Sequence, residues 1–250
     1  MSMFSLIIDG YERKARLYPA LLLLMPIAMI ALAASATKLS VLEGLGGAAV
    51  GCGGAFFLSQ FARDAGKKGE KALFEKWGGM PSVAVFRHRD IRIDPITKAR
   101  YHKRLADLVK GAKAPSANDE QEDPVAADGV YSAWSTYLRV NTRDTKKYSL
   151  LLQENINYGY RRNVWGLRHI GITITALCCI GSALWLYIQF RLTGRIMEEM
   201  VLAFGVTFLL LILWVFQFSS NWVRIPADAY AERLAETVET FGGKTSGGKQ

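Results

Sequence analysis

The chain has 250 residues, of which 50% are apolar and 21% are charged, and its formal net charge is +9. A soluble domain with this much charge is normally less apolar, so the apolar residues must be concentrated in segments. The composition therefore argues against a single ordinary soluble domain and favours a membrane protein with a basic soluble part.

Four segments contain no Asp, Glu, Lys, Arg or His: residues 17–37, 44–62, 170–190 and 200–223. Each has about 20 residues, which as a helix crosses the roughly 30 Å hydrocarbon layer of a bilayer. A signal peptide is the alternative for the first segment, but that segment is longer than a signal core and a second apolar segment follows closely. We predict four retained spans that form two helical hairpins, residues 17–62 and 166–223.

The basic residues predict how the spans are oriented. Residues 61–165 contain 20 Lys and Arg against 13 Asp and Glu, and three basic residues lie in the N-terminal segment 1–16. The connections between spans carry little net positive charge. By the positive-inside rule both termini and the central domain are cytoplasmic, in the inner membrane of a bacterial cell, and segment 1–16 lies along the membrane surface.

The central domain, residues 63–165, is expected to be mostly helical. Apolar side chains recur at helical spacing in residues 96–109, 130–139 and 144–160. Residues 82–86 are rich in β-branched and aromatic residues and are compatible with one or two short strands. Residues 112–128 combine small residues, two prolines and an acidic run, and this composition predicts a mobile loop.

The last segment, residues 224–250, predicts an amphipathic helix that begins at Pro226, followed by a disordered tail. Tyr230, Leu234, Val238 and Phe241 form one narrow apolar stripe on that helix. Such a stripe suits docking on the chain's own central domain, and a second copy or a partner helix is the alternative.

The second predicted span is rich in glycine, and Gly47, Gly51 and Gly54 lie among its small residues. Small residues four positions apart let two helix backbones approach closely in lipid. The first span of the same chain is the expected neighbour, and the alternative is a helix of another copy in a homo-oligomer.

Two basic clusters of the central domain are candidates for binding an anionic partner. They consist of Arg87, Arg89 and Arg92, and of Lys98, Arg100, Lys103 and Arg104. Attraction to anionic lipid headgroups explains such residues without a specific site. The sharper hypothesis is a cytoplasmic pocket for a phosphate-bearing ligand or an acidic protein, and a nucleic acid is a third candidate without further support.

No pattern of catalytic or metal-binding residues is visible, so we expect no enzyme activity, no metal and no cofactor. The three histidines lie among basic residues or at a span boundary, where surface roles are commoner than ligation. The predicted spans lack the ionisable groups that ion-coupled transporters normally need.

The sequence thus suggests a membrane protein whose cytoplasmic domain senses a ligand or partner and controls an oligomeric bundle of spans. This plan is similar to that of small bacterial membrane effectors of antiviral defence, which permeabilise the membrane, and the similarity is one of architecture alone. The alternative is a structural membrane subunit that recruits a soluble cytoplasmic partner.

Overall fold

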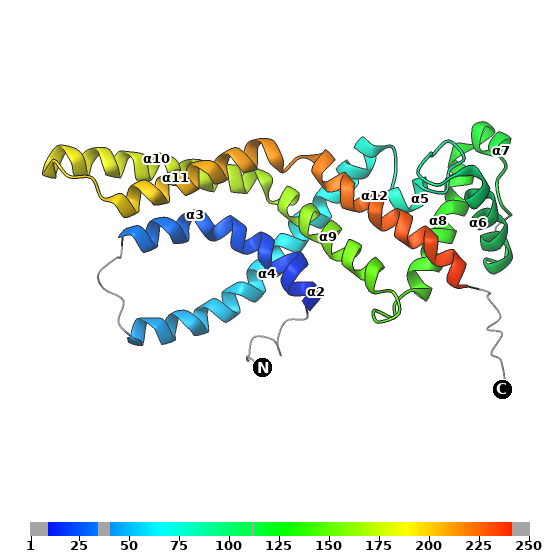
Figure 1. The fold of residues 1–250 in the computed structure, drawn as a ribbon, viewed down its shortest axis with the longest axis horizontal. Helices are drawn as coiled ribbons and strands as arrows, with labels where there is room; N and C mark the ends of the chain where they lie inside the picture. The colour runs from blue at the N-terminus through cyan, green and yellow to red at the C-terminus, as the bar shows by residue number, and fades with distance from the viewer. Residues whose placement is uncertain (1–9, 35–40, 112, 242–250) are drawn as a thin grey trace. The chain divides into compact units, whose positions relative to one another are not determined.

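The computed structural model describes residues 10–34, 41–111 and 113–241, with the backbone alone for residues 41–53 and 55. Every regular element within these residues is a helix (Figure 1). The chain divides into two compact units, which we call the span unit (Met1–Glu70 and Gly159–Val223) and the domain unit (Lys71–Tyr158 and Arg224–Gln250). The long C-terminal helix therefore belongs mostly with the central insert, although the two are far apart in the sequence.

The span unit contains three helical segments that are long and apolar enough to cross a membrane: Gly10–Ala34, Arg168–Thr193 and Glu198–Gln217. They correspond to three of the four predicted spans. In order, they comprise α2 (Gly10–Glu12), the π-helical turn η1 (Arg13–Leu17) and α3 (Tyr18–Ala34); α10 (Arg168–Thr193); and α11 (Glu198–Ile212) with the π-helical turn η2 (Leu213–Gln217).

The fourth predicted span, residues 44–62, lies within α4 (Val41–Trp77), a helix of 37 residues. Most of its side chains are outside the described residues, so it is not among the three segments and stays a prediction. The same holds for the predicted packing of Gly47 and Gly51. A Cβ atom at Gly54 would meet nothing within 4 Å, so this glycine marks no close helix approach within the described residues.

Helices α3, α10 and α11 lie side by side (Figure 1). On α10 the buried residues recur at helical spacing as Gly171, Thr175, Cys179 and Ser182. A Cβ at Gly171 would lie 2.5 Å from the Trp214 indole, so only glycine fits under that ring. Small residues at these positions allow the close helix packing that stabilises bundles in lipid.

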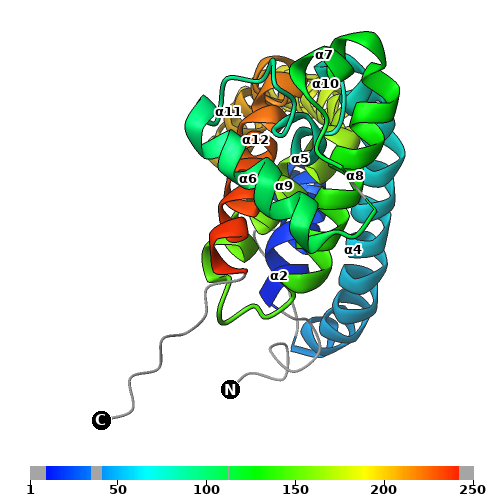
Figure 2. The same ribbon diagram turned by 90° about the vertical axis from the view of Figure 1, so that its right-hand side faces the viewer.

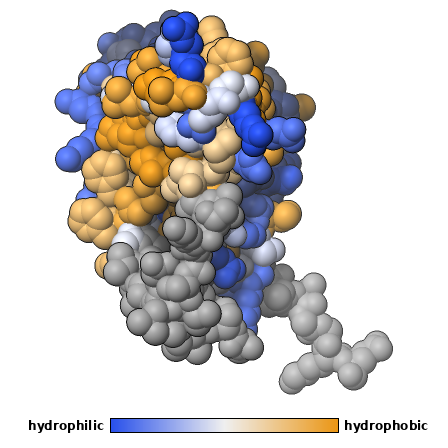
Figure 3. Space-filling model, turned by 90° about the vertical axis from the view of Figure 1, so that its left-hand side faces the viewer, coloured by the Kyte–Doolittle hydropathy of each residue, from blue (hydrophilic) through white to orange (hydrophobic). Residues whose placement is uncertain are grey.

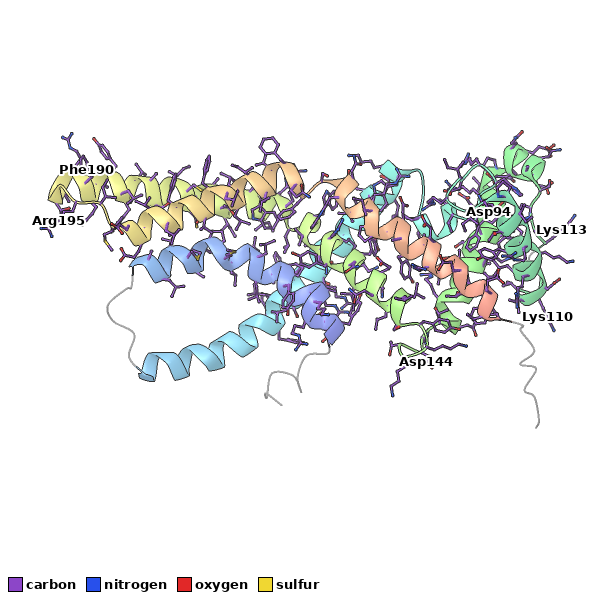
Figure 4. All side chains as sticks on the ribbon, in the orientation of Figure 1. Asp94, Lys110, Lys113, Asp144, Phe190 and Arg195 are labelled. Carbon is purple, nitrogen blue, oxygen red and sulfur yellow. The ribbon has the colours of Figure 1, made fainter. Side chains whose placement is uncertain are left out.

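The tight turn between α10 and α11 begins at Gly194, which has φ +65° and donates its N–H to the carbonyl of Phe190. Phe190 and Arg195 lie at this turn (Figure 4). Glycine adopts this left-handed conformation without the steric cost that a side chain would add. The second predicted hairpin is therefore present in the structure.

Large apolar side chains on the outer faces of these helices are exposed, including Leu177 at 64%, Leu192 at 78% and Phe216 at 76%. In the space-filling view, apolar residues cover much of the face that this view presents (Figure 3). Continuous exposed apolar surface on helices of this length is unfavourable in water and suited to lipid. The chain is therefore compatible with an integral membrane protein.

Two glycines bring α4 and α9 (Ser149–Gly166) into backbone contact within the span unit. A Cβ at Gly166 would lie 2.5 Å from the backbone carbon of Ala65, and one at Gly66 would lie 2.9 Å from the Cα of Asn163. The sequence predicts a close helix approach earlier in α4, at Gly47 and Gly51, which lie outside the described side chains. The crossing at Gly66 was not predicted from the sequence.

Arginines satisfy backbone carbonyls that the helices leave without partners. Where the π-helical turn η2 ends, Arg168 donates to the carbonyls of Trp214 (3.2 Å) and Val215 (2.6 Å). In α12 (Ser220–Glu236), Pro226 has no N–H for the carbonyl of Trp222. Arg161 donates to that oxygen at 2.9 Å and also lies over the Trp222 ring. Thus Pro226 lies inside the helix, and the prediction that the helix begins there was wrong.

The domain unit, whose helices face the viewer in Figure 2, packs around one apolar core. Its further elements are α5 (Pro81–Ala84), α6 (Pro95–Leu108), α7 (Ala117–Glu122), α8 (Pro124–Asn141) and the 3₁₀ turn η3 (Thr237–Thr240). The largest fully buried side chains are Trp134 and Tyr131 from α8 and Phe86 from the segment after α5. The helix predicted at residues 96–109 is confirmed as α6, which Asp94 caps through the N–H of Thr97 (Figure 4).

Two secondary-structure predictions for this unit were wrong. Residues 82–86 form no strand: Pro81 starts α5, and the N–H of Val85 bonds to its carbonyl at 3.0 Å. The predicted loop at residues 112–128 contains α7 and the start of α8. Ser116 and Asp119 form a reciprocal capping box at the start of α7, which satisfies the free N–H groups there.

Candidate functional site

The basic clusters predicted from the sequence lie in the domain unit, and several of their charged groups already have partners. Arg87 is 8% exposed and makes a bidentate contact with Asp128, Nε to Oδ1 at 2.8 Å and Nη2 to Oδ2 at 2.6 Å. Its Nη1 donates to the carbonyl of Gly78 at 2.7 Å. A Cβ at Gly79, which has φ +132°, would lie 2.6 Å from Nη2. The turn after α4 therefore closes over this guanidinium, and Arg87 has a structural role.

Arg92 joins the segment before α6 to α12. Its Nη2 lies 2.6 Å from Asp90 Oδ2, and its Nη1 lies 2.6 Å from Asp228 Oδ1. Burial alone would raise the pKa of Asp90, but the hydrogen bonds and charge of Arg92 hold that pKa below its ordinary value. Asp228 also accepts from Arg224 at 3.2 Å. These four side chains form one network of alternating charge.

The second predicted cluster is divided between a buried and an exposed group. Lys98 is 4% exposed and donates to the carbonyls of Arg87 and Asp90, and burial lowers its pKa. Arg100 and Arg104 both pair with Glu239, at 2.7 and 3.2 Å. Lys103 is exposed. These residues do not form one open anion-binding surface.

A cavity of about 130 Å³ lies beside the first cluster. It contains two more arginines than aspartates, and its full lining is Trp77, Gly79, Pro81, Ala84, Arg87, Arg89, Asp90, Arg92, Arg224 and Asp228. The indole Nε1 of Trp77 is buried and has no hydrogen-bond partner among the described residues. Arg89 and Arg224 have side chains 63% and 49% exposed, so of the four arginines they are best placed to meet a ligand. We call this the arginine cavity.

The arginine cavity combines predicted and unpredicted residues. Arg87, Arg89 and Arg92 were candidates from the sequence. Trp77, Arg224 and Asp228 were not: Trp77 lies shortly before the cluster, at the end of α4, and Arg224 and Asp228 come from α12, which is far from the cluster in sequence. Such helix ends carry no local signal of what they contact.

A second cavity, of about 500 Å³, shares Arg89 with the first. We call it the glutamate cavity, and its lining is His88, Arg89, Ala117, Glu120, Gln121 and Pro124. Glu120 is 5% exposed, and its Oε2 accepts from the His88 N–H at 2.7 Å and from the Tyr131 hydroxyl at 2.9 Å. Burial and this hydrogen bond raise the pKa of Tyr131, so the phenol remains a donor.

Beneath the glutamate cavity two histidine rings meet edge to face, with centroids 4.8 Å apart. The His102 ring bonds through Nε2 to the Phe86 carbonyl at 2.7 Å, and burial lowers its pKa to about 4. The His88 ring bonds through Nε2 to the Pro115 carbonyl at 2.9 Å. In the neutral tautomer that donates to Pro115, the Nδ1 of His88 is an acceptor.

The predicted stripe on the C-terminal helix is buried in the domain unit itself. Leu234 and Val238 are fully buried, and Tyr230 and Phe241 pack against the same core. The ring of Phe241 lies 5.9 Å from that of Tyr137 in an edge contact. This arrangement agrees with docking on the chain's own domain. It leaves no free stripe for a partner helix.

Comparison of the chain with protein-family models, with curated proteins and with solved structures gave no match. The geometry described above is therefore the basis for a functional proposal. Among the described cavities, the arginine cavity has the most cationic side chains in its lining, and it also contains the buried Trp77 Nε1, which has no hydrogen-bond partner among the described residues.

Proposed function

We propose that this protein is a membrane sensor: an anionic ligand binds in the arginine cavity, and its binding changes the packing of the spans and so the permeability of the membrane. The domain unit is the cytoplasmic sensor in this proposal, and the spans act as a homo-oligomeric bundle. The protein needs no catalytic group for this role. Its mode of action would be that of a membrane-permeabilising effector of bacterial antiviral defence.

The proposal rests on which helices line the arginine cavity. Trp77 is the last residue of α4, and Arg224 and Asp228 belong to α12. The same two helices also contribute residues to the span unit, up to Glu70 in α4 and from Ser220 to Val223 in α12. A helix transmits displacement along its axis because its backbone hydrogen bonds resist stretching. A ligand that shifts the ends of α4 and α12 would therefore act on segments of both units.

The charge arrangement suits an anion that binds reversibly. Asp228 accepts from Arg224 and Arg92, and Arg89 lies 3.9 Å from Glu120, beyond a normal hydrogen bond. A phosphate group could draw Arg89 and Arg224 toward each other with charge-assisted hydrogen bonds, which are roughly twice as strong as neutral ones. The cavity is smaller than the range of about 300–1,000 Å³ typical of whole-ligand pockets, so it suits a single anionic group.

The proposal is tested with the full chain in liposomes loaded with a self-quenching dye. Pyrophosphate and inorganic phosphate are added outside to vesicles that carry the domain unit outward, and dye release is measured. Release should depend on the anion and be lost in the variant R89A/R224A. The matched control is R233A, which removes an arginine that is equally exposed (49%) from the same helix as Arg224 but outside the cavity.

Anion binding is measured in parallel by calorimetry. Binding without release would support the structural-subunit alternative and contradict the permeability proposal. Absence of binding in the wild-type chain, or equal binding by R89A/R224A, would remove the arginine cavity as the sensor. R87A is not used here, because its loss would leave Asp128 unpaired and weaken the fold.

A further inference from the structure

Arg89 lines both cavities of the domain unit, and the two cavities differ in chemistry. The arginine cavity is cationic and small, at about 130 Å³. The glutamate cavity is about 500 Å³, within the range for a whole small-molecule group. A ligand that bonds to Arg89 therefore meets a side chain that belongs to both linings.

The glutamate cavity would repel an anion but accept hydrogen-bond donors. Glu120 uses Oε2 for the His88 N–H and the Tyr131 hydroxyl, whereas its Oε1 accepts no hydrogen bond within the described residues. The Arg89 Nε lies 3.9 Å from Oε1, beyond a normal hydrogen bond, so a ligand N–H can bond to this oxygen. The exposed amide of Gln121, on the same cavity wall, can both donate and accept.

We propose that the two cavities form one composite site for a nucleotide, with the phosphate in the arginine cavity and the base in the glutamate cavity. This inference rests on the proposed function for the phosphate half and adds the second half. Nucleotides fit because they join an anionic group to a planar heterocycle whose edge carries N–H donors. An N–H group of the base bonds to Glu120 Oε1, the Gln121 amide bonds to the edge of the base, and Arg89 lies between base and phosphate.

The charge of the two cavities argues against the reverse placement. A phosphate beside Glu120 would meet a carboxylate that is only 5% exposed, and like charges at low dielectric repel strongly. The arginine cavity, by contrast, has four arginines against two aspartates in its lining, which favours the anionic group. The charge of the two cavities therefore assigns the two halves of the ligand.

The test compares ribose 5-phosphate, which has no base, with AMP, GMP, CMP and UMP by calorimetry on the full chain in detergent. At least one nucleotide should bind about tenfold more tightly than ribose 5-phosphate, the effect of one hydrogen bond to a charged group. In Q121A and E120Q this preference should fall toward onefold, while the affinity for ribose 5-phosphate stays unchanged. E120Q keeps an oxygen for the His88 N–H and the Tyr131 hydroxyl, and Q121A alters an exposed side chain, so at least one variant retains the fold.

The matched control is Q153A, an exposed glutamine on α9 outside both cavities, and it should keep the full preference. If ribose 5-phosphate binds through Arg89 but no nucleotide binds more tightly, the composite site is refuted and the arginine cavity stands. If Q121A and E120Q both keep the preference, the base lies elsewhere and the inference is wrong. If none of the five compounds binds, both the inference and the proposed function fail.

Discussion

Replacement of Gly166 by alanine should weaken the crossing of α4 and α9 in the span unit. The added Cβ would lie 2.5 Å from the carbon of Ala65 and 2.5 Å from the nitrogen of Gly66. Both are backbone atoms, so no change of side-chain rotamer relieves the overlap. Ordinary contact begins near 3.4 Å, so the two helices must separate by about 1 Å.

This separation also affects the polar contacts at the crossing. Arg162 donates to Glu70 at 2.9 Å and Asn163 donates to the carbonyl of Ala15 at 2.8 Å, and both contacts join α9 to another segment of the unit. Overpacking typically costs about 1–3 kcal/mol, and one weakened charged hydrogen bond adds about 1 kcal/mol. Gly166 is the last residue of α9, so the better helix propensity of alanine offsets less than the roughly 0.5–1 kcal/mol expected in the middle of a helix. The net loss is about 1–3 kcal/mol, or a melting temperature roughly 3–10 °C lower for a chain of this size.

The assay is thermal unfolding in detergent, followed by tryptophan fluorescence. Gly181 offers the control: it lies in α10, and a Cβ there would meet nothing within 4 Å. Neither glycine has a positive φ, so alanine strains neither backbone. G181A should melt at the wild-type temperature or slightly above it. The crossing as described would be refuted if G166A melted as high as G181A.

Three further predictions concern stability. Burial lowers the pKa of His102 from 6.5 to about 4, so between these pH values the unfolded chain binds a proton that the folded chain does not. The free energy of unfolding should therefore fall by about 3 kcal/mol as the pH drops from 6.5 to 4. Urea titrations should show a weaker pH dependence for H102Q. D128A should lower the free energy of unfolding by about 2–3 kcal/mol because it leaves the guanidinium of Arg87 buried without its carboxylate, whereas an unchanged urea midpoint would contradict the ion pair. R161A should lower the free energy of unfolding of the wild type by about 1 kcal/mol. Its effect should be smaller in the P226A background, where residue 226 regains an N–H that can bond to the Trp222 carbonyl. Equal effects of R161A in both backgrounds, measured by a double-mutant cycle, would show that Arg161 does not replace the missing N–H of Pro226.

The spans were the part of the fold most readable from the sequence, because the absence of charge over about 20 residues is a local property. The helices with strong apolar periodicity, such as α6, were likewise readable. Residues 82–86 were not, because a short run with four apolar residues fits a short strand or a buried helical turn equally well. Pro81 and the burial of Phe86 decide in favour of the turn. Pro81 can be read from the sequence, but the burial of Phe86 is known only from the tertiary structure.

The start of α7 shows a signal that was present and overlooked. Ser116 and Asp119 have the spacing of a capping box, but the acidic and small residues around them resemble a solvated loop. Composition describes the average of a segment, whereas a cap depends on two positions. In contrast, the meeting of Gly66 with Asn163 joins segments about a hundred residues apart, and no local pattern predicts it.

The sequence predicted the arginines of the candidate site but not the carboxylates that pair with them. A run of arginines in the sequence suggests free positive charge, but it does not show where the carboxylates lie. Asp128 and Glu239 neutralise members of both clusters from distant helices. Arg89 keeps most of its exposure because its carboxylate is 3.9 Å away, and Arg224 enters the cavity from α12. Ligand binding should therefore depend on Arg89 and Arg224 far more than on the other arginines, whose removal acts first on the fold.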